Sequence, residues 1–210
     1  MTTKLQQKTN LRLVSGFTVV EMLVSIGIVT LIMSSVLFNY STFGDNLSLS
    51  SAGQELAITI RQSQTYGLTV KEVSLGGGKF DAAYGMNFNL SDDSSYYLFA
   101  DTINNSVYDV VSGCGSGPTN TECIEKFNLR NGIKISKICD ASSCSPSGST
   151  MLNITFKRPN PDANINFTNS AGGIVVSASP TGKIELTSPK GKTLMITVES
   201  TGQVLVGPVI

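Results

Sequence analysis

The chain has 210 residues, of which 40% are hydrophobic and 14% charged, with fifteen basic and fifteen acidic side chains and no histidine. A chain of this length is expected to form about one domain. The missing histidine excludes Ser-His-Asp and Cys-His nucleophilic sites, histidine-ligated zinc and imidazole acid–base chemistry. The composition therefore favours a secreted or surface protein rich in β-structure, and we expect neither enzymatic activity nor a cofactor.

The N-terminus contains a basic segment followed by an apolar one. Residues 1–16 have no acidic side chain and three basic ones, Lys4, Lys8 and Arg12, a pattern typical of a segment held in the cytoplasm. Phe17 to Phe38 form an apolar run in which only Glu21 is ionisable. At about 1.5 Å per helical residue this run is long enough to cross a bilayer core of about 30 Å. We therefore expect one membrane-spanning helix, with the rest of the chain outside the cytoplasm.

Two features of this segment need an explanation. A carboxylate within an apolar span is costly, so Glu21 requires a partner. An ordinary signal peptide has its small-residue cleavage site after the apolar core, whereas the small residue here, Gly16, precedes the core. Cleavage after Gly16 would remove the basic leader and keep the membrane helix.

The stretch SGFTVVEMLVSIGIVTLI resembles the N-terminus of type IV prepilins: it carries their glycine (Gly16), the aromatic residue that becomes the new N-terminus (Phe17), a threonine (Thr18) and the glutamate (Glu21). The resemblance implies that a prepilin peptidase cuts between Gly16 and Phe17 and methylates the freed amine. In a filament of packed helices, Glu21 would face the amine of Phe17 on a neighbouring subunit, and each charge would offset the desolvation of the other. The alternative is a simple anchor whose glutamate lies at the headgroup level.

The helical pattern continues beyond the apolar run. One stripe of an amphipathic helix is formed by Leu49, Ala52, Leu56 and Ile60. Gly67 is a plausible C-terminal stop, whereas Gly44 and Gly53 weaken the prediction of an unbroken helix. The expected organisation is a leader at 1–16, a long helix at 17–67 with membrane or filament part 17–38 and amphipathic part 39–67, and a β-rich domain at 68–210.

From Val70 onward the apolar residues alternate, which predicts strands. The predicted strands are Val70–Leu75, Tyr84–Leu90, Tyr96–Ala100, Val107–Val111, Ile124–Leu129, Ile133–Ile138, Met151–Phe156, Ile174–Ser179, Ile184–Thr187, Leu194–Glu199 and Val204–Val206. Turn residues separate them, among them Gly76-Gly77-Gly78, Asn131-Gly132, Pro180-Thr181-Gly182 and Pro189-Lys190-Gly191. We expect an α+β chain in which the helix packs on one or two antiparallel sheets, the plan of the pilin fold.

Within that plan the C-terminal part resembles the minor pseudopilins of the GspH/FimT type, through the succession YGMNF, YYLFAD, IEKFNL, FKRPNPDANI and GKTLMITVESTGQVLV. The resemblance implies a structural subunit of a type II secretion pseudopilus or a type IV pilus, located in the inner (cytoplasmic) membrane as a single-pass protein. Its expected partners are other pilins, the prepilin peptidase and an inner-membrane assembly platform. The alternative is a DNA-binding or ligand-binding minor pilin of a competence or adhesion pilus.

Four cysteines lie in or beside polar loops: Cys114, Cys123, Cys139 and Cys144. Three pairings are possible, and we favour the sequence-local ones, Cys114 with Cys123 and Cys139 with Cys144, because each closes a loop in an oxidising compartment. A zinc site of four thiolates is the rival, but the spacings are wider than the usual knuckles. We therefore expect no metal.

Nucleic acid is not an expected partner. Removing the leader leaves twelve basic and fifteen acidic residues, a net charge of −3, which is poor for polyelectrolyte binding. Two local basic clusters exist, Arg130 with Lys134 and Lys137, and Lys183 with Lys190 and Lys192; such turn lysines commonly protect sheet edges. The DNA-receptor members of the FimT branch are expected to carry an arginine-rich C-terminal tail, whereas the tail here reads STGQVLVGPVI.

Overall fold

The structure is a computed structural model that describes residues 16–69, 80–109, 114 and 122–210, with the side chains of 38–43 excepted. The described chain is α+β, with one long helix and two antiparallel sheets. It divides into two compact units, Met1–Thr42 and Phe43–Ile210, which are described separately. The second half of the helix thus belongs to the same unit as the strands.

The helix α1 runs from Val19 to Leu68 without interruption, through both Gly44 and Gly53. In the first unit, Val19–Leu37 is apolar and none of it is buried. This is the only helix among the described residues that is long and apolar enough to cross a membrane, a property that anchors share with signal sequences.

In the second unit the amphipathic stripe of α1 is buried as predicted: Leu49, Ala52, Leu56 and Ile60 all belong to the main hydrophobic core. Gly53 and Gly67 lie on the same packed side of the helix, Gly53 against Leu194 and Gly67 against Phe156. Gly67 lies inside α1, which ends at Leu68. Both glycines therefore permit close packing, and neither breaks the helix.

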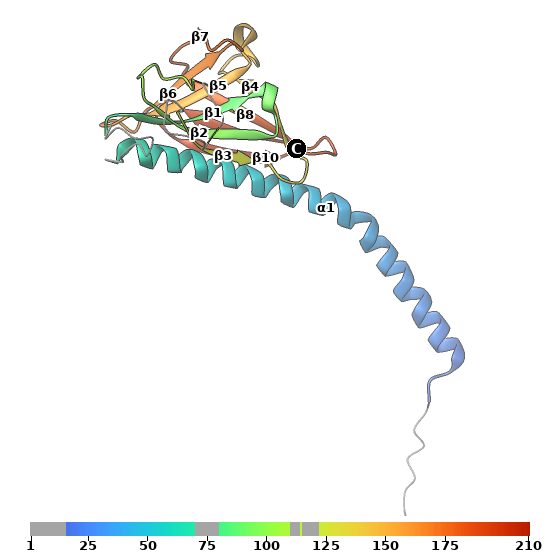
Figure 1. The fold of residues 1–210 in the computed structure, drawn as a ribbon. Helices are drawn as coiled ribbons and strands as arrows, with labels where there is room; N and C mark the ends of the chain where they lie inside the picture. The colour runs from blue at the N-terminus through green and yellow to red at the C-terminus, as the bar shows by residue number, and fades with distance from the viewer. Residues whose placement is uncertain (1–15, 70–79, 110–113, 115–121) are drawn as a thin grey trace, which may run out of the picture. The chain divides into compact units, whose positions relative to one another are not determined.

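Ten strands follow within the described residues: β1 Ala83–Asn89, β2 Ser95–Asp101, β3 Cys123–Asn128, β4 Lys134–Cys139, β5 Met151–Phe156, β6 Ala163–Thr168, β7 Ile174–Val176, β8 Thr181–Thr187, β9 Thr193–Glu199 and β10 Val204–Val209. Two short 3₁₀ turns, η1 Leu90–Asp92 and η2 Pro146–Gly148, connect them. One sheet has the order β3-β2-β1-β5-β6-β7 and the other β10-β9-β8-β4, with every neighbouring pair antiparallel. Figure 1 shows α1 lying along this β domain over residues 43–68.

The strand predictions need four corrections. Ala163–Thr168 forms β6 although we predicted no strand there. Residues 107–109 of the predicted strand Val107–Val111 are irregular. The predicted turn Pro180-Thr181-Gly182 is wrong at its last two residues, which begin β8. The strand predicted to reach Ser179 ends at Val176. Val70–Leu75, Gly76–Gly78 and residues 110–111 lie outside the described residues.

The core lies between α1 and the inward faces of the two sheets. Alternate residues of β1 and β5 point into it and pair across the strands, for example Met86 with Ile154 and Phe88 with Leu152. Both of these central strands are also buried on their outer face. The cover there is the segment 102–109, which carries Tyr108 against Phe99. A strand buried on both faces can hold polar groups only if they are hydrogen-bonded.

Candidate functional site

The N-terminal segment places its predicted site residues at the start of α1. Gly16, Phe17 and Thr18 precede the helix and are exposed, Phe17 to 81%. A Cβ added to Gly16 would meet no atom within 4 Å. The Gly16-Phe17 peptide bond is therefore accessible, and a peptidase could reach it without unfolding the described part of this unit.

Thr18 has a role that our sequence analysis missed. Its Oγ1 accepts a hydrogen bond from the backbone N–H of Glu21 at 3.2 Å, so Thr18 is the N-cap of α1 and Glu21 is the third helical residue. The sequence Thr-Val-Val-Glu matches the capping-box pattern, which could have identified it. The Glu21 carboxylate also lies in the first helical turn, where the partial positive charge of the helix N-terminus favours an anion.

The four cysteines form two disulfides, Cys114 with Cys123 and Cys139 with Cys144. The sequence separations are 9 and 5 residues. Cys123 is buried in a small cluster with Phe99 and Tyr108. With all four sulfurs in bridges, this form of the protein has the chemistry of an oxidising compartment.

Two neighbouring acidic residues, Asp92 and Asp93, each have local partners. Asp92 accepts hydrogen bonds from Ser95, Tyr97 and Lys126, and Asp93 pairs with Lys134 at 2.9 Å. Burial raises the pKa of Asp92, but the hydrogen bonds outweigh it and lower that pKa to about 2. These carboxylates hold the segment around η1 to β2, β3 and β4.

Asp101 and Glu122 hold the covering segment 102–109 by its backbone. Asp101 accepts from the N–H groups of Asn105 at 3.1 Å and Ser106 at 2.7 Å. Glu122, only 4% exposed, accepts from Thr102 at 2.8 Å and Asp109 at 3.0 Å. Burial raises the pKa of Glu122 despite these bonds. Our sequence analysis assigned Glu122 no role, because its partners become neighbours only through the pairing of β2 with β3.

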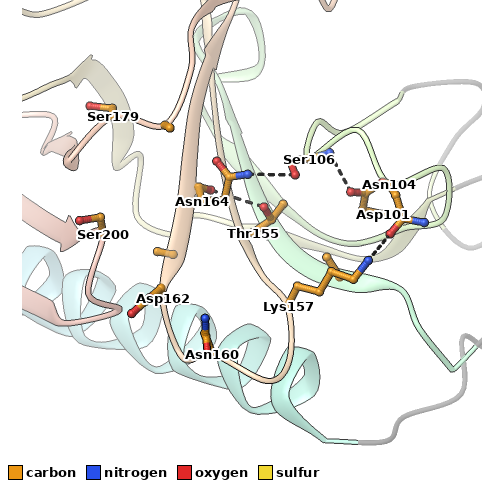
Figure 2. Close-up of a pocket in the computed structure, with 13 residues that line it drawn as sticks. Asp101, Asn104, Ser106, Thr155, Lys157, Asn160, Asp162, Asn164, Ser179 and Ser200 are labelled. Carbon is orange, nitrogen blue, oxygen red and sulfur yellow. Dashed lines mark hydrogen bonds between the residues drawn. The ribbon is translucent and has the colours of Figure 1, made fainter.

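A polar pocket of about 420 Å³ opens between the covering segment and the loops after β5 and β7. Figure 2 shows Lys157 pointing at Asn104, with Nζ 2.7 Å from the amide oxygen, and Asn164 pointing at Ser106, with Nδ2 3.1 Å from Oγ. Further amide, hydroxyl and carboxylate groups come from Asn160, Asp162, Ser179 and Ser200. Such a lining suits a small polar ligand bound through hydrogen bonds.

Members of the two predicted basic clusters lie on neighbouring elements of the β domain, because β4 pairs with β8 and Lys134 is opposite Thr187. Lys134 and Lys137 are each paired, with Asp93 at 2.9 Å and with Glu185 at 3.0 Å. Lys183 lies within β8, whereas Lys190 and Lys192 lie on the turn that follows that strand. The clusters predicted from sequence therefore do not form two separate basic patches.

Comparison with protein-family models, with curated proteins and with solved structures found no match to this chain.

Proposed function

We propose that this protein is a membrane-anchored filament subunit of the type IV pilin kind, a minor pilin or pseudopilin of a type II secretion pseudopilus or a type IV pilus. The observation that carries the proposal is the division of α1 into two halves. Val19–Leu37 is apolar and unburied, whereas the half within Phe43–Leu68 buries its apolar stripe under two sheets. An apolar helix that the described residues leave unburied must be covered by lipid or by other helices.

The proposed processing starts from the accessible Gly16-Phe17 bond. Its cleavage would remove the basic leader, and the new cationic amine at Phe17 would lie one helical turn from Glu21 in the chain. Within one subunit, the Glu21 carboxylate favours the start of α1 through the helix dipole. Between subunits, the same carboxylate would pair with a neighbour's amine in a medium of low dielectric constant.

The proposed location follows from the same features. The apolar helix is an anchor in the inner membrane, and the two disulfides suit a β domain on the oxidising side. The partners would be other pilins, the prepilin peptidase and the assembly platform, and the subunit itself would have no active site.

The test is the intact mass and N-terminal sequence of the protein extracted from its host's membrane. We expect a chain that begins with N-methylated Phe17. Gly16→Leu should leave the full precursor, because the residue before the cut would no longer be small. Gly27→Leu is the matched control: it makes the same change at a position where an added Cβ also meets no atom within 4 Å, and it should be cut normally. An intact Met1 in the unmutated protein would refute the processing.

A further inference from the structure

We propose that two turns of the β domain, residues 130–134 and 188–192, form a binding surface for the anionic headgroups of phospholipids. We call them the basal turns. The inference rests on the membrane anchoring in the proposed function, and it is independent of cleavage after Gly16 and of filament assembly. The bound lipid would belong to the bilayer that holds the apolar half of α1.

The basal turns meet at the point where the chain enters the second unit. Ser188 Oγ donates to Asp45 Oδ2 at 2.6 Å, and Asn131 Nδ2 donates to Ser48 Oγ at 3.2 Å. Gly132 has φ +71° and packs on Pro189, whose Cγ would lie 2.9 Å from a Cβ at position 132. The two turns therefore form one continuous surface beside the first residues of this unit.

Chain connectivity limits how far this surface can lie from the end of the candidate span. Leu37 ends the candidate span, and Asp45 follows it by eight residues. Eight residues reach at most about 29 Å when fully extended and about 12 Å as helix. Because Ser188 is bonded to Asp45, the basal turns are tethered within this range of the bilayer boundary.

The charge of the surface is positive although that of the whole chain is zero. The basal turns carry Arg130, Lys134, Lys190 and Lys192. Among the described residues, the acidic groups close to these turns in the chain or in the pairing of β4 with β8 are Asp45, Asp92, Asp93 and Glu185; Asp92 is paired with Lys126 and Glu185 with Lys137. Four basic side chains against Asp45 and Asp93 leave a net charge of +2. Arg130 and Lys190 are exposed, and Lys192 is half-buried.

A hollow of about 600 Å³ opens at the same place. Its wall includes Lys134 beside Asp93, and also Ser136 and Ser188, whose hydroxyls donate to Glu185 and to Asp45. Ammonium and guanidinium groups bind phosphate oxygens through charge-assisted hydrogen bonds, and each basic side chain near an anionic membrane surface strengthens binding about fivefold. The protection of sheet edges by lysine is an alternative explanation for the presence of these basic residues. It does not explain why they lie together beside Asp45, where the chain enters the second unit.

The experiment uses the full chain reconstituted in two kinds of nanodisc, one of phosphatidylcholine and one containing phosphatidylglycerol. Hydrogen–deuterium exchange is measured at the basal turns and at the turn 200–203. That second turn is the internal reference, because Gly202 accepts from Gln64, about 28 Å along α1 from Asp45. We expect exchange at the basal turns to slow at least about fivefold in anionic discs, and the reference turn to stay unchanged. High salt should abolish the effect because it shortens the Debye length to about 3 Å at 1 M.

Two variants of equal charge test the assignment. The double variant Arg130→Gln with Lys192→Gln should lose most of the protection from exchange. Removing two basic side chains should weaken the docking equilibrium about twenty-five-fold. Lys157→Gln with Lys183→Gln removes the same charge elsewhere in the domain and should leave the protection intact. Equal exchange in both discs, or equal loss in both variants, would overturn the inference. A chain that does not co-purify with the discs would instead refute the anchoring, so the two failures are distinguishable.

Discussion

Gly67, in the last turn of α1, lies directly against the backbone of Phe156 on β5: a Cβ on Gly67 would overlap the Phe156 carbonyl group. The contact continues two residues later, where the backbone N–H of Arg158 donates to the Gly67 carbonyl at 3.1 Å. Helix and strand therefore meet backbone to backbone, and the end of α1 is fixed on the six-stranded sheet.

Gly67→Ala should consequently destabilise the protein by about 1–3 kcal/mol, the usual cost of overpacking, although alanine is the better helix former. Gly44→Ala is the control, since a Cβ at that exposed helical position meets nothing within 4 Å. It should stabilise α1 by up to about 1 kcal/mol. Thermal unfolding of both variants in detergent provides the comparison, and a Gly67→Ala protein as stable as Gly44→Ala would contradict the close contact.

The pKa of Asp92 predicts a pH dependence of stability. Hydrogen bonds lower this pKa from 3.8 to about 2, which corresponds to roughly 2.5 kcal/mol at most. Since the side chain is 30% exposed, screening reduces the contribution to about 1 kcal/mol. Above pH 3.8 the carboxylate is ionised in both states and this stabilisation is complete. As the pH falls towards about 2, the unfolded chain binds the proton first and the stabilisation is lost.

Asp92→Asn should therefore lower the free energy of unfolding by about 1 kcal/mol at neutral pH, with the difference from the unmutated protein shrinking between about pH 4 and pH 2. Denaturant unfolding at a series of pH values measures it. Asp93→Asn breaks a more exposed ion pair and should cost less than Asp92→Asn. A difference for Asp92→Asn that persists undiminished at pH 2 would show that the charge is not its source.

Asn153 connects the outer face of the six-stranded sheet to the covering segment. Its Oδ1 accepts from Asn87 Nδ2 at 2.8 Å and from the backbone N–H of Tyr108 at 3.1 Å, and its Nδ2 donates to Thr168 at 3.2 Å. Asn153 is fully buried. Asn153→Leu would leave two buried donors, Asn87 Nδ2 and the backbone N–H of Tyr108, without an acceptor. Each unsatisfied donor costs about 1–3 kcal/mol.

We expect Asn153→Leu to destabilise the protein by about 2–5 kcal/mol and to accelerate amide exchange at Tyr108. The control is Asn164→Leu on the same face, an exposed residue with one bond to Ser106, which should cost about 1 kcal/mol or less. Denaturant unfolding with exchange mass spectrometry reports both quantities. Similar losses from the two substitutions would mean that the Asn153 network is not what holds the segment.

Alternation along the chain predicted most strands, because residues such as Met86 and Phe88 alternate with polar neighbours that face outward. It missed β6, where Ile165 and Phe167 alternate with Asn164 and Asn166, because asparagine is depleted in strands and the preceding Asn160-Pro161-Asp162 is typical of a turn. Alternation also predicted a strand that includes residues 107–109. These residues are instead irregular, and Tyr108 packs against Phe99 on the outer face of the sheet.

The strand order and the pocket were beyond sequence reasoning. β1 pairs with β5, from Tyr84 with Phe156 to Asn89 with Met151, and no local pattern specifies a partner about seventy residues away. The pocket lining comes from segments as distant as Asp101 and Ser200. The N-terminal site stays a prediction from one short stretch of sequence, and even there our sequence analysis missed the capping role of Thr18.

The two roles of Glu21 can be separated by substitution. Glu21→Gln removes the charge but keeps a side chain that suits the third position of a capping box. Thr18→Ala keeps the charge and loses the N-cap bond, at a cost of about 1 kcal/mol to the helix. In the proposed filament, Glu21→Gln would leave a neighbour's amine unpaired in an apolar medium, a penalty of several kcal/mol.

We therefore expect Glu21→Gln to be cut after Gly16 as usual but to enter filaments at least about tenfold less than the unmutated protein, since 1.4 kcal/mol already corresponds to a factor of ten. Thr18→Ala should assemble at near-normal levels. The measurement compares the protein in sheared filaments with that in membranes. If Thr18→Ala lost assembly while Glu21→Gln kept it, the start of the helix and not the charge pair would control incorporation, because only the first variant weakens the cap.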